Sequence, residues 1–321
     1  MKIEKLTPAF KDYLWGGTKL RDVYGKPCDF DKVAESWELS THSAGESKIT
    51  GGRFDGMTLG EYLNSVGEGR AVCGTNCEKF EFFPVLIKFI DAKDPLSIQV
   101  HPSDEYALKV EGEYGKTEMW YVMDCEPGAF LYFGVNREIT KEEFRRRIEN
   151  NTVLEVLNRV DVHPGDVFFI ESGTIHAIGA GILICEIQQN SNCTYRVYDY
   201  DRRGADGKPR ELHVEKALAV SRFTPSDTAD KQGKSEQVPG GTVKKLASCK
   251  YFTTEKLDIS GEMELEVTKE SFVSLIVLKG QAKLSGPENT VEATAGESIF
   301  VPAGTGRLTV SGTCSIIKTT V

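Results

Sequence analysis

The sequence predicts a mainly β protein that contains two related barrel-like units. Short runs of β-branched and aromatic residues, bounded by Gly, Pro, Asp or Asn, recur along the 321-residue chain. A segment near the middle of the chain is repeated in its C-terminal third. Helical patterns are few, so we expect helices only as additions to a β framework.

The predicted strands of the first unit are runs of five to eight apolar and aromatic residues broken by turn formers. They are residues 85–90, 96–100, 118–123, 129–135, 166–170, 182–188 and 193–200.

The clearest helical signal follows Thr140, because Glu143 lies three residues later and completes the spacing of a capping box. Thr152 and Glu155 repeat this spacing, so a helical insert is predicted around 138–158. Further helices are predicted at 59–66 and 213–223.

A polar stretch divides the chain. Residues 224–242 are rich in turn formers and contain no strand-like run, which is typical of a linker or a long exposed loop. We therefore expect one β domain at 1–223 and a second at 243–321.

The internal repeat pairs PGDVFFIESGTIH, residues 164–176, with AGESIFVPAGTGR, residues 295–307. The offset is constant (295 − 164 = 131), and both copies read as a Gly-acid turn, an apolar strand and a Gly turn. Arg307 stands where the first copy has His176. If His176 binds a metal, the second unit has lost that ability.

Bulk properties exclude several classes of partner. A net charge of −9 argues against nucleic acid and anionic membranes, although a small anionic substrate needs only a local basic cluster. The N-terminus lacks a signal-peptide core, and the most apolar run contains Lys88, so no membrane span is expected. Of eight cysteines only Cys73 and Cys77 are close together, which predicts reduced thiols in a cytoplasmic protein.

One predicted strand carries an unusual polar pair. Gln99 and His101 are two residues apart, so they share a face of the strand, which stops at Pro102. That face is either solvated or built to hold a ligand. On these residues alone both interpretations stand, because most histidines in strands are ordinary.

Two segments resemble the sequence motifs of the cupin family. PGDVFFIESGTIHAIGAG resembles the second motif, and QVHPSDEYALKVEGEYGKTEMW the first, with Gln-x-His in place of His-x-His. The resemblance implies two jelly-roll barrels, an N-terminal one that binds metal and a degenerate C-terminal one. It implies one Zn²⁺ per chain, with ligands Gln99, His101, Glu118 and His176. Alternatively, Glu118 is a solvated strand residue and His176 bonds only to backbone.

A closer resemblance is to the type I mannose-6-phosphate isomerases in their short bacterial form. PLSIQVHP, GKTEMWY, SGTIHAIGAG and YRVYDYDR carry it, together with Trp15-Gly16-Gly17 and residues 34–40. It implies a zinc-dependent aldose–ketose isomerase that interconverts mannose 6-phosphate and fructose 6-phosphate through an enediol. The expected partner is then a small phosphosugar.

The same resemblance implies roles for further residues. The catalytic residues are Arg196 and Lys116, and the alternative for Arg196 is a surface charge paired with Asp199 or Asp201. The substrate-binding residues are Lys88, Ser97, Trp15 and Glu35.

Two rival functions differ in class. A cupin oxygenase or decarboxylase would usually show His-x-His and act on small acids, whereas this chain has Gln-x-His and basic residues nearby. A non-catalytic sugar-phosphate-binding module would not need Lys116 and Arg196. The sequence makes no prediction of oligomeric state.

Overall fold

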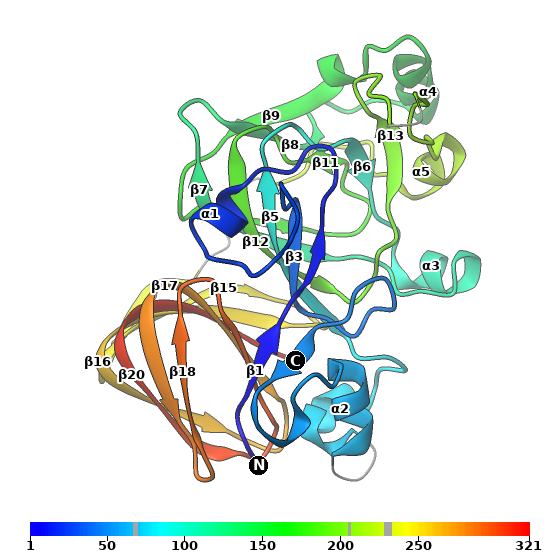
Figure 1. Cartoon of the computed structure of the whole chain (residues 1–321). Coiled ribbons are helices and arrows are strands. Elements are labelled where there is room, and N and C mark those ends of the chain that lie inside the picture. The colour runs from blue at the N-terminus through cyan, green and yellow to red at the C-terminus, as the bar shows by residue number, and fades with distance from the viewer. Residues whose placement is uncertain (67–69, 205–206, 228–232) are drawn as a thin grey trace.

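The computed structural model describes residues 1–66, 70–204, 207–227 and 233–321. They form two β units that lie one above the other in Figure 1, with the helices at the margins. The N-terminal unit contains a six-stranded and a five-stranded sheet, and the C-terminal unit a nine-stranded sheet. The mainly β fold with two units expected from the sequence is confirmed.

Two sheets make up the N-terminal unit, and each of the seven predicted runs provides a strand of one of them. The six-stranded sheet consists, in spatial order, of β10 (Val167–Ile170), β7 (Glu118–Cys125), β12 (Ile182–Gln189), β5 (Val85–Ala92), β3 (Glu35–Leu39) and β2 (Ala9–Lys11). The five-stranded sheet consists of β13 (Tyr195–Tyr198), β6 (Ile98–Val100), β11 (His176–Ala177), β8 (Phe130–Val135) and β9 (Leu157–Asp161).

The nine-stranded sheet takes strands from both ends of the chain. Its strands are β14 (Ser235–Val238), β15 (Gly241–Ser248), β16 (Thr253–Val267), β20 (Gly306–Thr320), β17 (Val273–Ser285), β19 (Ser298–Val301), β1 (Glu4–Thr7) and β4 (Lys48–Thr50), with β18 (Thr290–Thr294) beside β17. Because β1 pairs with β19, the structural units do not follow the expected boundaries. Residues 235–238, expected in the linker, instead form β14 against β15, and 228–232 lie outside the described residues.

The α-helices are short and peripheral. They are α1 (Lys19–Asp22), α2 (Leu59–Ser65), α3 (Asp104–Val110), α4 (Lys141–Glu149) and α5 (Val214–Val220). The 3₁₀ helices are Gly52–Phe54, Ala71–Cys73, Thr75–Cys77 and Val153–Val156. Among the described residues, no helix is long and apolar enough to cross a membrane.

The helical insert is only partly as expected. Thr140 Oγ1 accepts a hydrogen bond of 3.0 Å from Glu143 N, so this N-cap of α4 is confirmed. The second capping signature is wrong, because Thr152 makes no side-chain cap and the Glu155 carboxylate pairs with Arg147 instead. The chain makes one 3₁₀ turn and then pairs with β8 as β9.

The repeat is visible in backbone hydrogen bonds. Gly165 N donates to Val122 O at 2.8 Å, and Gly296 N donates to Val277 O at the same distance. Both glycines have positive φ, 98° and 90°, which a side chain would disfavour. The predicted repeat is therefore a repeated structural element, which aligns β7 with β17 and β10 with β19.

One apolar cluster joins the two units. Leu39, Met119 and Ile187 of the N-terminal unit pack with Phe272 and Phe300 of the C-terminal unit, and each is at most 1% exposed. The units therefore share a core, so the C-terminal unit is placed to influence the geometry of the first.

Candidate metal centre and active site

The six-stranded sheet presents a row of polar and aromatic side chains on one face. Strand register places Glu186 of β12 between Trp120 of β7 and Lys88 of β5, and Lys88 lies opposite Trp37 of β3. Side chains directly opposite in antiparallel strands share a face. Glu118 lies two residues before Trp120, and therefore on this same face.

The five-stranded sheet presents a second row. His176 of β11 and Arg196 of β13 are the register partners of Gln99 on the two sides of β6. Ser97 lies two residues before Gln99, and its Oγ accepts a 3.3 Å hydrogen bond from Arg196 Nε. Gln99, His176 and Arg196 thus come from this row, and Glu118 comes from the row on the six-stranded sheet.

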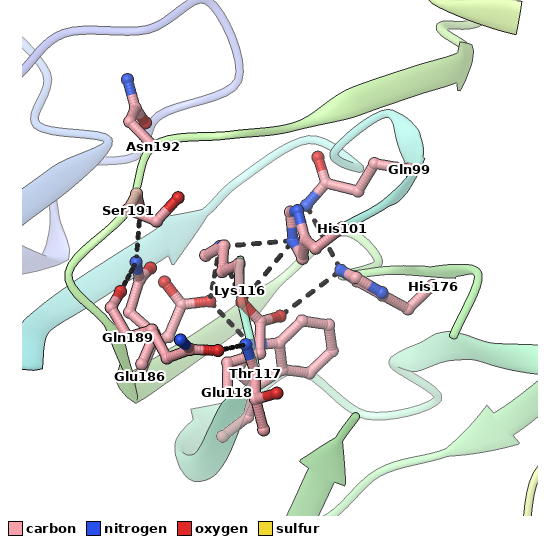
Figure 2. Close-up of polar contacts among 12 residues, drawn as sticks. Gln99, His101, Lys116, Thr117, Glu118, His176, Glu186, Gln189, Ser191 and Asn192 are labelled. Atoms are coloured by element: carbon pink, nitrogen blue, oxygen red, sulfur yellow. Dashed lines mark hydrogen bonds and ion pairs between the residues drawn. The ribbon is translucent and has the colours of Figure 1, made fainter. Parts of the chain in front are cut away.

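Three side chains from these two sheets converge in a buried cluster. Ligand atoms of His101, Glu118 and His176 all lie within 4.8 Å of one another. His176 Nε2 is 3.3 Å from Glu118 Oε1, and His101 Nε2 is 3.6 Å from Glu118 Oε2 (Figure 2). The three residues are at most 1% exposed. The solvated alternative for Glu118 is therefore wrong.

Backbone carbonyls orient both imidazoles. His101 Nδ1 is 2.9 Å from Cys193 O, and His176 Nδ1 is 2.8 Å from Thr174 O. Donation from Nδ1 leaves the Nε2 lone pairs directed at Glu118. Burial lowers the pKa of His176 to about 4, and burial with the nearby Lys116 charge lowers that of His101 well below its usual value. Both rings are thus neutral, which is the form that binds metals.

The cluster fits a divalent cation. Both Glu118 oxygens are buried; Oε2 lies 2.6 Å from Lys116 Nζ, whereas Oε1 has no hydrogen-bond donor among the described residues. A buried carboxylate oxygen without a donor is costly, so a cation there would satisfy it. Two imidazoles and a carboxylate are a donor set that zinc accepts. Gln99 is half-buried, with its amide nitrogen 3.5 Å from His176 Nε2, and its role as a fourth ligand stays a prediction.

A buried charge network extends from the cluster. Lys116 Nζ is 2.6 Å from Glu118 Oε2 and 3.7 Å from Glu186 Oε1 (Figure 2). Lys88 Nζ is 3.1 Å from Glu186 Oε2 and 3.4 Å from Glu35 Oε2. Lys116 therefore lies in the site as expected. Lys88 is already paired with two carboxylates, Glu35 and Glu186. This argues against an ion pair between Lys88 and the phosphate of a substrate.

Sequence reasoning missed Glu186. It is 2% exposed, and it accepts a 2.9 Å hydrogen bond from Trp120 Nε1. Although burial opposes ionisation, Lys116 and Lys88 hold the pKa of Glu186 below its usual value. The sequence did contain one indication of its role, because Glu186 is the only acid in the mostly apolar run ILICEIQ. A carboxylate buried in such a strand requires a charged or hydrogen-bonding partner.

The Arg196 side chain donates to Ser97 Oγ and Glu211 O and not to a carboxylate of a described residue. Asp199, the suggested partner, is bound by Arg202 and Arg210, with Arg210 Nε 2.7 Å from Asp199 Oδ2. Burial lowers the pKa of Arg196, and the Arg210 charge lowers it further. Arg202 and Arg210 flank the Asp199 carboxylate, with Arg196 and Glu211 nearby, so this group carries a net positive charge.

The remaining implied substrate-binding residues, Glu35 and Trp15, are both buried. Glu35 is 7% exposed and accepts a 2.7 Å hydrogen bond from Trp37 Nε1, so it belongs to the charge network. Trp15 is 4% exposed and packs in an apolar cluster with Ile90 and Trp120. Its substrate contact stays a prediction.

The matching positions of the second unit cannot form the same cluster. The β10–β7 register pairs Ile170 with Glu118, and the β19–β17 register pairs Val301 with Val273, so a buried valine replaces the glutamate. Arg307, in the place of His176, pairs with Glu264 at the surface. The C-terminal unit thus lacks both the carboxylate and the imidazole at these positions.

The chain is similar to known phosphomannose isomerases. Residues 3–125 match the model of the phosphomannose isomerase type I catalytic domain, and residues 242–321 match the mannose-6-phosphate isomerase cupin domain. The chain is 39% identical over 313 residues to the probable mannose-6-phosphate isomerase GmuF of Bacillus subtilis, covering 97% of each. The chain belongs to the type I phosphomannose isomerase family.

Another relative and two solved structures are also similar to this chain. Mannose-6-phosphate isomerase ManA of Bacillus subtilis is 39% identical over 306 residues, which are 95% of this chain and 94% of ManA. The crystal structure of the mannose 6-phosphate isomerase from Bacillus subtilis superimposes with a TM-score of 0.93 at 37% identity, covering all of both chains. A mannose 6-phosphate isomerase bound with zinc and yttrium shares the fold, with a TM-score of 0.77 at 18% identity and 99% of each chain covered.

Proposed function

We propose that the protein is a zinc-dependent mannose-6-phosphate isomerase, which interconverts mannose 6-phosphate and fructose 6-phosphate through an enediol. The observation that best supports this proposal is the buried His101–Glu118–His176 cluster with Lys116 beside it. Family membership supports the substrate, and the donor set supports zinc at one site per chain. Eight unpaired cysteines support a cytoplasmic location.

The substrate phosphate is assigned to the basic end of the site. Arg202 and Arg210 carry two positive charges beside the Asp199 carboxylate, which leaves a net charge of about +1 for a phosphate dianion. Ser97, which Arg196 contacts, belongs to the same end. The sugar then extends toward Lys116 and the buried cluster, which places carbons 1 and 2 near the metal ligands.

The reaction moves a proton between carbon 2 and carbon 1 of the open-chain sugar. Removing the proton from carbon 2 of the aldose leaves negative charge on oxygen 1, which gains a proton as oxygen 2 loses its hydroxyl proton; returning a proton to carbon 1 then gives the ketose. Lys116 is assigned to stabilise that charge beside the cluster, and Arg196 to stabilise it from the facing sheet. Bound zinc supplies a positive charge that polarises the substrate oxygens.

Buried residues keep these groups in place. Glu186 holds Lys116 and Lys88, and Lys88 in turn contacts Glu35. Because all of these side chains are buried, the Lys116 ammonium faces the site in a low-dielectric setting where its charge acts strongly. The assigned role of Lys88 is thus to position Glu186.

A coupled assay tests the proposal. Purified protein is supplied with fructose 6-phosphate, and mannose 6-phosphate is measured enzymatically in ordinary and in deuterated water. We expect turnover, and deuterium at carbon 2 of the product to the extent that the transferred proton exchanges with solvent. Lack of turnover by the zinc-loaded protein, or oxygen uptake on small acids in its place, would contradict the proposal.

A further inference from the structure

The segment that carries Lys116 and Glu118 is fixed by three consecutive backbone amides. Gly115 N donates to Asp104 Oδ1 at 2.9 Å, Lys116 N to Pro102 O at 3.0 Å, and Thr117 N to Gln189 Oε1 at 2.9 Å. Gly115 lies so close that an added Cβ would be 2.4 Å from the Ser103 carbonyl carbon. The backbone on either side of Lys116 therefore has little freedom.

Asp104 is the common acceptor of this arrangement. Its Oδ1 accepts from Gly115 N and, at 2.7 Å, from Gln189 Nε2, whose own amide oxygen binds Thr117 N. Its Oδ2 accepts a 2.6 Å hydrogen bond from Tyr251 Oη. Although burial opposes ionisation, the hydrogen bonds led by Tyr251 hold the pKa of Asp104 below its usual value. The carboxylate is therefore a charged acceptor, which makes strong hydrogen bonds.

Tyr251 belongs to the C-terminal unit. It lies between β15 and β16, is 7% exposed, and its ring packs near Phe80 with a centroid separation of 6.3 Å. Its hydroxyl reaches out of its own unit to Asp104. Lys250, at 3.5 Å from Asp104 Oδ2, is largely exposed and so adds less.

We propose that Tyr251 is a positioning residue, through which the metal-free C-terminal unit holds Lys116 and Glu118 at the site. The hydroxyl fixes the Asp104 carboxylate, and that carboxylate fixes Gly115 and Gln189. Gln189 and Gly115 then fix the backbone from which Lys116 and Glu118 project. The degenerate barrel thus contributes to the active site through one hydrogen bond. The kinetic part of this inference rests on the proposed function, whereas the metal-binding part does not.

The test compares Tyr251→Phe with Tyr121→Phe in the full-length, zinc-loaded protein. Both changes remove one tyrosine hydroxyl near the shared core of the two units, but Tyr121 lies on the opposite face of β7 from Glu118 and is not linked to Asp104. The readouts are backbone amide exchange at 115–117, zinc release to a chelator, kcat and KM. The first two do not depend on the reaction.

We expect Tyr251→Phe to speed exchange at these three amides and to release zinc about tenfold faster, the lower end of the usual effect of groups that orient ligands. Its kcat should fall about three- to tenfold with KM changed less than twofold, because small misplacements chiefly reduce turnover. Adding Asp104→Asn to Tyr251→Phe should cost less than the product of the separate effects, because both act through one bond.

Equal rates of amide exchange at 115–117 and of zinc release in Tyr251→Phe and Tyr121→Phe would overturn the inference. A loss of turnover in Tyr251→Phe without faster amide exchange would overturn it as well. If the wild-type protein shows no isomerase turnover, the proposed function fails, while amide exchange and zinc release still decide this inference.

Discussion

Replacing Arg196 separates chemistry from metal binding more cleanly than any other change at the site. The side chain contacts Ser97 Oγ at 3.3 Å and Glu211 O at 2.8 Å, and it is not a candidate ligand of the metal cluster. Losing these two hydrogen bonds should cost about 0.5–1.5 kcal/mol each in folding free energy, which a domain of ordinary stability tolerates. The variant Arg196→Ala should therefore fold and retain zinc.

Its effect on turnover should be much larger. If the guanidinium stabilises charge that develops on the enediolate oxygen, its loss should lower kcat about 10²- to 10³-fold, or about 2.7–4 kcal/mol in activation free energy. KM should change little by comparison. Arg196→Lys should recover only part of the rate, because lysine restores a charge without the planar fork. The coupled assay provides kcat and KM, and elemental analysis provides the zinc content.

Arg210→Met is the matched control, because Arg210 lies in the same basic cluster but binds Asp199. We expect KM to rise about tenfold with kcat nearly unchanged, as for a group that binds ground state and transition state equally. If Arg196→Ala instead raises KM sharply and leaves kcat near normal, Arg196 is a phosphate-binding residue and its catalytic assignment is wrong.

Three further predictions concern metal and stability. His176→Ala should lose both zinc and turnover while keeping its β-sheet circular dichroism, and full zinc occupancy would exclude His176 as a ligand. Elemental analysis should find about one metal per chain, because Arg307 and Val273 replace ligands in the C-terminal unit, and two would reveal a second site. Lys26→Met should lower the unfolding free energy by about 3–5 kcal/mol in denaturant titrations, because it strands the buried Glu38, 2.6 Å from Lys26 Nζ; a loss below 1 kcal/mol would contradict this.

The site was predicted mainly from the resemblance to cupin and isomerase motifs, and local spacing supplied only part of it. Gln99 and His101 share a strand face by period two, and the Gly turns at 165 and 173 bound the strand before His176. The repeat likewise predicted that the second unit would lack a metal site, since Arg307 replaces His176. The seven strand runs of the first unit were correct because each is apolar and bounded by turn formers.

What the sequence could not provide depends on contacts between distant segments. Nothing local to Glu4–Thr7 shows that it pairs with β19, some 290 residues later, so the unit boundaries were missed. The capping box expected at Thr152 does not form, because the Glu155 carboxylate pairs with Arg147. The substrate-binding role expected for Lys88 stays a prediction; the sequence did not show the two buried carboxylates, Glu35 and Glu186, that the sheet register brings beside it.

The most direct test of a metal-centred isomerase is turnover measured against bound zinc. Protein stripped by a chelator is titrated with zinc, and the conversion of fructose 6-phosphate to mannose 6-phosphate is followed at each step. The His101–Glu118–His176 assignment predicts no turnover without metal, a linear rise with added zinc, and a plateau at about one equivalent per chain. Full turnover by the metal-free protein, or a plateau at two equivalents, would contradict it.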